Sequence, residues 1–85
     1  MDAEEIRKLA KQKAFVFGTE KTLKLLRQQK VAQVFLTKNC PAAVREEIAA
    51  HLNAAEIVEL DQTNQELAIL CKVPHLVSVM SLPAQ

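Results

Sequence analysis

Apolar residues along the chain alternate between a helical spacing and short continuous runs. The helical spacing begins in residues 2–13, where Asp2 is suited to cap the first turn. The continuous run 14–17 predicts a short buried strand, and Gly18 ends it because glycine favours turns. The chain is therefore predicted to open with a helix followed by a strand.

A second helix and strand follow the same alternation. Thr19 is predicted to cap a helix that runs to about Lys30, with Leu23 and Leu26 facing inward. The run 31–37 is apolar and is bounded by polar residues, which is typical of a strand that is buried on both faces.

A proline and a four-residue spacing mark the third helix. Pro41 fits the first helical position, where the missing N–H of proline costs nothing. The inward face of this helix is expected to carry Val44, Ile48 and Leu52. Residues 55–60 are predicted to form the next strand.

The last helix has a capping signature. Thr63 and Glu66 match a capping box, and Pro74 is predicted to end the helix because proline cannot continue it. Residues 75–82 are predicted to form the final strand. One face of that strand is expected to carry Leu76, Met80 and Leu82.

The predicted order of elements is α-β-α-β-α-β-α-β. Such alternation favours the α/β class, with helices on both faces of a largely parallel or mixed sheet. The chain has 85 residues, 49% of them hydrophobic, which suits one domain and is too apolar for a disordered tail. We therefore expect residues 1–85 to form a single domain.

The net charge of +1 argues by itself against a nucleic-acid partner, because nucleic-acid-binding domains are usually strongly basic. The distribution of charge changes that interpretation. Residues 1–45 carry ten basic and four acidic side chains, a net charge of +6, whereas residues 46–85 carry one basic and six acidic side chains, a net charge of −5. This asymmetry predicts a local site for a polyanion in the first half.

The second predicted helix is the best candidate for that site. Lys21, Lys24 and Gln28 fall on one of its faces, and the backbone amides after Gly18 point out of its N-terminal end. A helix N-terminus flanked by lysines favours anions. A solvated helix face is the plainer interpretation of the same pattern.

The composition excludes several classes of protein. The chain has one glycine, so it can form neither a Gly-rich phosphate loop nor a dinucleotide-binding turn. No apolar run approaches the ~20 residues that span a bilayer, and the acidic N-terminus lacks the apolar core of a secretory signal, so no membrane partner is expected. Cys40 and Cys71 form no C-x-x-C pair, which favours a reduced, cytoplasmic setting.

Catalytic chemistry is sparse, and we expect no enzyme activity and no cofactor. One imaginable zinc set fits no compact spacing: Cys40, His51, Cys71 and His75. Cys40 precedes a predicted helix N-terminus, which could lower the pKa of its thiol and leaves a thiol or redox enzyme as a minor alternative. Ser78 and Ser81 lie in the last predicted strand and not on a nucleophile elbow.

Three segments in order resemble the kink-turn RNA-binding family, which includes the archaeal and eukaryotic large-subunit ribosomal proteins of the thirty-e and seven-Ae types. The first segment is 17–24, Phe-Gly-Thr-Glu-Lys-Thr-Leu-Lys. The second is 39–48, Asn-Cys-Pro-Ala-Ala-Val-Arg-Glu-Glu-Ile, which is close to the thirty-e branch. The third contains Glu66, Leu67, Cys71, Pro74, Val77 and Ser78. The likeness covers nearly all of the chain after the first helix.

The resemblance implies a three-layer α/β/α sandwich around a four-stranded mixed sheet. It also implies that RNA binds at a strand-to-helix turn, whose residues here are Gly18, Thr19, Glu20, Lys21 and Lys24. A second surface, which cradles an extruded base in the family, maps onto Val73, Pro74, His75 and Leu76. Lys38 and Asn39 form a candidate third contact, and Lys72 is a candidate phosphate contact. RNA is read best where pairing is distorted and bases are splayed out.

Some residues depart from the family pattern. Glu20 and Lys21 stand where the seven-Ae branch carries asparagine and glutamate, and Ala68 and Lys72 stand where glycine is usual. The leading interpretation is an RNA-binding protein of a large ribosomal subunit or another cytoplasmic ribonucleoprotein particle, in contact with structured RNA and neighbouring proteins. The alternative is a protein-interaction module that keeps the fold and has lost RNA recognition.

Overall fold

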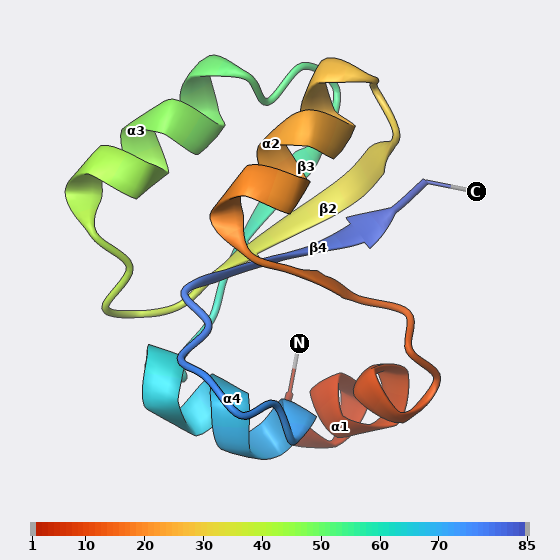
Figure 1. The fold of residues 1–85 in the computed structure, drawn as a ribbon, viewed down its shortest axis with the longest axis vertical. Helices are drawn as coiled ribbons and strands as arrows, with labels where there is room; N and C mark the ends of the chain where they lie inside the picture. Colours follow the sequence, from red (N-terminus) through yellow and green to blue (C-terminus); the bar gives the residue numbers. More distant parts are fainter. Residues whose placement is uncertain (1, 85) are drawn as a thin grey trace.

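A computed structural model describes residues 2–84, so residues 1 and 85 of the predicted domain lie outside the described residues. Helices and strands alternate along the chain, as the sequence predicts (Figure 1). The elements are α1 (Ala3–Lys11), β1 (Val16–Phe17), α2 (Thr19–Arg27), β2 (Val31–Leu36), α3 (Ala42–Ala50), β3 (Glu56–Glu59), α4 (Asn64–Cys71) and β4 (Val79–Pro83). No helix within residues 2–84 is long and apolar enough to cross a membrane.

The strands form one mixed sheet in the order β1-β4-β2-β3. β3 runs parallel to β2, whereas β4 lies between β1 and β2 and runs antiparallel to both. Phe35 of β2 is paired with Met80 of β4 and with Val58 of β3. This arrangement places the carboxyl ends of β1, β2 and β3 and the start of β4 at the same edge of the sheet.

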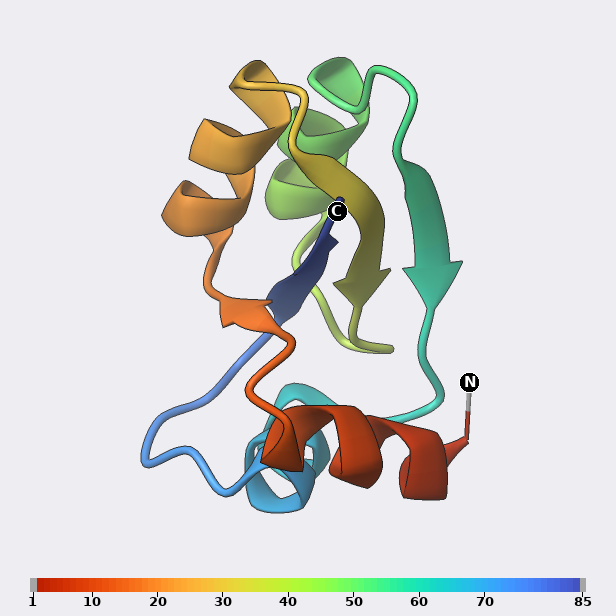
Figure 2. The ribbon, with the colours of Figure 1, turned by 90° about the vertical axis from the view of Figure 1, so that its right-hand side faces the viewer.

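Two helices cover each face of the sheet, which confirms the predicted three-layer sandwich (Figures 1 and 2). α2 and α3 lie on one face, and α1 and α4 lie on the other. A separate cluster of buried side chains fills each interface. Leu23, Leu26 and Ile48 belong to the cluster under α2 and α3, and Ile6 and Leu67 belong to the cluster under α1 and α4.

The central strands supply both clusters, because successive side chains of a strand point to opposite faces. Val34 and Leu36 of β2 join the α2–α3 cluster, and Phe35 between them joins the α1–α4 cluster. In β4, Val79 joins the α2–α3 cluster and Met80 joins the α1–α4 cluster. The prediction that β2 is buried on both faces is therefore confirmed.

The predicted cap of α2 was wrong by one residue. Gly18, with a φ of 107°, is the N-cap, and Thr19 is the first residue of the helix. Gly18 is fixed on both sides because its N–H donates to the carbonyl oxygen of Val79 at 2.9 Å and its own carbonyl accepts from the N–H of Thr22 at 3.2 Å. The helix also ends at Arg27 and does not reach Lys30.

Pro41 likewise precedes its helix. It is the N-cap of α3 with a ψ of 143°, which is an extended conformation, and α3 begins at Ala42. Of the predicted inward face, Ile48 is buried and Val44 packs against the same cluster. Leu52 also packs there, although it lies beyond the end of α3.

The last strand begins later than the sequence indicates. α4 ends at Cys71 because Lys72 takes the left-handed conformation with a φ of 56°, so the helix is over before Pro74. Residues 73–78 then form a loop, and β4 starts at Val79. Leu76 is 62% exposed in this loop and shares no strand face with Met80.

Buried hydroxyl groups join α2 to the sheet. Thr22 of α2 and Ser81 of β4 are both fully buried, and the Thr22 hydroxyl donates to the Ser81 hydroxyl oxygen at 3.2 Å. Ser81 in turn donates to the carbonyl oxygen of Val16 at 3.5 Å. Ser81 is thus a structural residue that links α2, β4 and β1.

The predicted capping box of α4 is confirmed. The Thr63 hydroxyl accepts from the backbone N–H of Glu66 at 3.2 Å, and the Glu66 carboxylate accepts from the backbone N–H of Thr63 at 3.0 Å. These hydrogen bonds, first the one from the Thr63 backbone, lower the pKa of Glu66 from its ordinary value. At the start of α1, Asp2 accepts from the N–H of Glu5 at 2.9 Å, as predicted.

The lowered pKa of Glu66 makes the stability of the fold depend on pH. A carboxylate with a depressed pKa stabilises the folded state above its unfolded pKa of about 4.3, and that contribution disappears as the pH falls through the folded pKa. We expect Glu66→Gln to lower the urea midpoint at pH 7 and to leave it close to wild type at the acid end. Glu46→Gln, which removes an exposed carboxylate of α3, is the control. An equal deficit for Glu66→Gln at both pH values would contradict the capping role.

The hydroxyl pair can be tested by a double-mutant cycle. Thr22→Val is expected to destabilise the protein by about 1 kcal/mol, because it leaves a buried hydroxyl oxygen without its donor. Ser81→Ala should cost a similar amount, and the double variant should cost less than the sum of the two. Urea unfolding measures all three free energies, and strict additivity would argue against a coupled pair.

Candidate nucleic-acid interface

Three loops meet at the edge of the sheet where the parallel strands end. The turn after β1 is joined to the start of β4 by the hydrogen bond from Gly18 to Val79. The end of β2 is joined to the loop before β4, because the N–H of Thr37 donates to the carbonyl oxygen of Ser78 at 3.0 Å. The three segments that the resemblance singles out, 18–24, 38–39 and 72–76, therefore border one edge of the molecule (Figure 1). Ligands of open α/β sheets bind at such edges.

The N-terminus of α2 is open toward solvent at this edge. Gly18 provides no side chain to accept the N–H groups of the first turn. A Cβ placed on Gly18 would meet no atom within 4 Å, although the φ of 107° is strained for any L side chain. The backbone is therefore accessible to a ligand at this point. Thr19 is half-buried beside it, and Glu20 is exposed.

The predicted basic face of α2 is present. Lys21, Lys24 and Gln28 line one shallow hollow of about 380 Å³, together with Leu25 and Val16 of the edge strand β1. Both lysines are exposed. These three side chains can thus contact the same ligand. The hollow lies between α2 and the outermost strand of the sheet, β1.

The loop between α4 and β4 forms a second hollow, of about 310 Å³. The loop residues that line it are Val73, Pro74, His75 and Leu76. Its other wall is α4, which contributes Gln65, Ala68 and Ile69. Ile69 and Leu76 are the large apolar side chains that are most exposed among the described residues, at 70% and 62%. This hollow has the size and the apolar character to hold a planar group.

Gln65 and Ile69 were missed by the sequence reasoning. They are exposed residues of α4 one helical turn apart, and an isoleucine on the polar face of a short helix was the signal that could have found them. Ala68 was noted only as a departure from glycine. It is buried beneath the hollow, and its methyl group leaves room above it.

Lys38 and Asn39 have different roles. The N–H of Lys38 donates to the carbonyl oxygen of Gln62 at 2.9 Å, and its side chain is exposed. The side chain of Asn39 is occupied by Asn64, donating to its amide oxygen at 3.0 Å and accepting from its backbone N–H at 2.8 Å. Asn39 therefore holds this loop against the start of α4.

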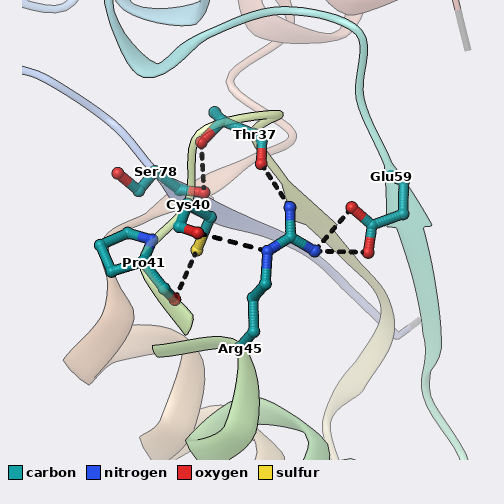
Figure 3. A network of polar contacts seen from close by, with 6 residues as sticks. All are labelled: Thr37, Cys40, Pro41, Arg45, Glu59 and Ser78. Carbon is teal, nitrogen blue, oxygen red and sulfur yellow. Dashed lines mark hydrogen bonds and ion pairs between the residues drawn. The ribbon is translucent and has the colours of Figure 1, made fainter. Parts of the chain in front are cut away.

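Arg45 of α3 anchors the same edge, a structural role that the sequence analysis did not predict (Figure 3). Its guanidinium donates to both carboxylate oxygens of Glu59 at 2.7 Å and to the carbonyl oxygen of Thr37 at 2.8 Å. It also donates to the carbonyl oxygen of Cys40 at 3.3 Å. The hydrogen bond to Glu59 raises the pKa of Arg45 above its ordinary value. Arg45 thus ties α3 to the ends of β2 and β3.

The lysines of the edge form no close ion pair, although the charge of Lys38 contributes to the lowered pKa of Glu66. Among residues 2–84 the ion pairs are Arg7–Glu4 and Arg45–Glu59. The exposed lysines of the three loops have no acidic partner in that range: Lys21, Lys24, Lys38 and Lys72. Asp61 and Glu66 follow β3 at the same edge, so the positive charge is concentrated toward β1, β4 and β2.

The cysteines have packing roles. Cys40 belongs to the α2–α3 cluster and Cys71 packs against the α1–α4 cluster, so the two thiols lie on opposite faces of the sheet, and both are free. Burial raises the pKa of both thiols, and for Cys40 this outweighs the nearby Arg45 charge. The expectation of a lowered pKa at Cys40 was wrong. Residues 2–84 contain no group of three or more His, Cys, Asp or Glu side chains that could hold a metal ion.

Two curated relatives are similar to nearly the whole chain. Large ribosomal subunit protein eL30 of Methanopyrus kandleri is 33% identical over 69 residues, which is 79% of this chain and 63% of that protein. The eL30 protein of Archaeoglobus fulgidus is 32% identical over 77 residues, which is 91% of this chain and 87% of that protein. These relatives are ribosomal proteins and not enzymes.

Solved structures share the fold. The Giardia lamblia 15.5kD RNA binding protein superposes with a TM-score of 0.71 at 17% identity, covering 94% of this chain and 68% of that chain. A protein of unknown function from Bacillus halodurans superposes with a TM-score of 0.73 at 14% identity, covering 91% and 78%. The sequence model of one family, described as "Ribosomal protein L7Ae/L30e/S12e/Gadd45 family", matches residues 3–83. The chain therefore belongs to the Ribosomal protein L7Ae/L30e/S12e/Gadd45 family.

Proposed function

We propose that this chain is an RNA-binding protein of a large ribosomal subunit or another cytoplasmic ribonucleoprotein particle, and that it recognises a kink-turn or a similar internal loop. The observation that carries the proposal is an open helix N-terminus flanked by Lys21 and Lys24, on the same side of the sheet as the apolar hollow of the α4–β4 loop. Membership of a family of ribosomal proteins supports it. Neighbouring proteins of the particle are further partners.

Each part of the edge suits a different part of a distorted RNA. The amides of the first turn of α2, with Lys21 and Lys24, bind backbone phosphates. The space beside Gly18 lets the RNA approach the protein backbone. Thr19 and Glu20 face the edges of sheared base pairs, where a carboxylate accepts from amino groups. The hollow between Ile69 and Leu76 takes an extruded base.

A protein-interaction module is the second candidate function. The carboxylate of Glu20 repels phosphates near the α2 N-terminus, and Ile69 and Leu76 together form an exposed apolar patch that a protein partner would also cover. Co-purification discriminates the two, because the chain has neither Trp nor Tyr and its absorbance ratio at 260 over 280 nm is therefore sensitive to bound RNA. A low ratio with a stable protein partner favours the module.

The lysine contribution can be measured by salt titration against a kink-turn RNA. Binding should weaken steeply with salt, and Lys21→Ala and Lys24→Ala should each cost about 1 kcal/mol or more and each reduce the salt slope by about one. Lys30→Ala, at the opposite end of β2, is the matched control. Salt-independent binding, or no binding to any structured RNA, would refute the proposal.

The apolar hollow predicts a dependence on the extruded base. Ile69→Gln and Leu76→Gln should each weaken binding to the kink-turn RNA by about tenfold, because covering a large aliphatic side chain contributes roughly 1.5–3 kcal/mol when its burial is complete. The same variants should bind normally to an RNA that lacks the extruded nucleotide. Both side chains are exposed, so folding should be unaffected. An equal loss of affinity for the two RNAs would mean that the extruded base does not bind in this hollow.

A further inference from the structure

A third hollow adjoins the start of the α4–β4 loop, on the face of the molecule that α1 and α4 cover. It has a volume of about 180 Å³ and forms where the C-terminal halves of the two helices meet. Figure 2 shows α1 and α4 side by side beneath the sheet, with the loop after α4 emerging next to them. The hollow is lined by Arg7, Ala10, Lys11, Leu70, Cys71 and Lys72.

The lining of this hollow is basic at the rim and apolar at the floor. Lys11 and Lys72 have no acidic partner among residues 2–84. Arg7 is paired with Glu4 at 3.4 Å, but the two side chains are 49% and 85% exposed, and such surface pairs are weak. The adjoining hollow of α1 is mixed in charge, because Glu4 and Glu5 line it together with Arg7, Lys8 and Lys11, so the positive charge is concentrated where α1 meets α4.

Lys72 connects this basic hollow to the edge of the sheet. It lines the α1–α4 hollow, and the next residue, Val73, lines the apolar hollow of the α4–β4 loop. The left-handed backbone of Lys72 caps the C-terminus of α4 and turns the chain into the α4–β4 loop. An exposed lysine therefore stands at the junction of two candidate binding surfaces.

We propose that Arg7, Lys11 and Lys72 form a second phosphate-binding surface, which holds the RNA backbone after it leaves the α4–β4 loop. This inference rests on the proposed function, and it extends the contact from the edge of the sheet onto the α1–α4 face. Continuity with the loop favours RNA over an acidic protein, because one strand can contact both hollows without leaving the surface.

The same charges also have a structural explanation. The hollow lies at the C-terminal ends of two helices, where cations stabilise the helix dipole. The two explanations predict different effects when the positive charges are removed. Loss of dipole compensation lowers the unfolding temperature only, whereas loss of a phosphate contact changes affinity and its salt dependence.

The test compares two RNAs. One is a minimal kink-turn, and the other carries the same kink-turn with both flanking strands extended. The variant is Arg7→Gln with Lys11→Gln, which leaves the three loops intact. Arg27→Gln with Lys30→Gln, which removes two exposed charges at and beyond the C-terminal end of α2, is the charge-matched control. On the extended RNA we expect the double variant to bind about tenfold more weakly at 0.15 M salt, with the salt slope smaller by about 1.5. On the minimal RNA its affinity should stay within twofold of wild type.

Equal weakening on both RNAs, or no weakening on either, with or without a lower unfolding temperature, would overturn this inference while the proposed function stands. In each of these the wild-type protein still binds the minimal RNA, and the Lys21 and Lys24 variants still weaken that binding. Poly-glutamate serves as the probe for an acidic protein partner. If it binds the wild type but not the double variant, and both proteins bind the two RNAs equally well, the surface belongs to a protein partner and the inference also fails. Absence of wild-type binding to both RNAs would refute the proposed function and the inference together.

Discussion

The antiparallel insertion of β4 between β1 and β2 is the constraint on which the rest of the structure depends. β4 pairs on both sides and is buried on both faces, so it closes the sheet and completes both hydrophobic clusters. Its direction also decides where the candidate site lies. Because β4 enters at the edge where β1 and β2 end, the loop that precedes it must meet the turn at Gly18 and the end of β2.

Hydrogen bonds then fix the relative positions of these loops. Ser78 at the end of the α4–β4 loop accepts from Thr37, whose own carbonyl accepts from Arg45. Arg45 is in turn held by both oxygens of Glu59 (Figure 3). A helix on one face of the sheet therefore sets the position of a loop that starts on the other face. Such a rigid frame limits the entropy that the loops lose when they bind a structured ligand.

The sequence was sufficient to predict the number, order and layering of the elements, because both helical spacing and buried runs are local patterns. It was weakest where a boundary is decided by tertiary pairing. Gly18 is the cap of α2 because β4 holds it, and Lys72 ends α4 two residues before Pro74. For the candidate site, spacing along α2 placed Lys21 and Lys24 on one face, whereas the contribution of Ile69 depends on how α4 packs and could not be read locally.

The topology divides the positive charge of the first half of the sequence between two surfaces. The basic first half of the sequence supplies α1 and α2, which lie on opposite faces of the sheet, so its charge is divided between two surfaces. Lys72, the single base of the acidic half, adds to the surface of α1 at the start of the α4–β4 loop. A flat duplex would contact one surface at a time, whereas a sharply bent RNA can follow the edge from one face to the other. The shape of the charge therefore favours a kinked ligand, although the total charge is close to zero.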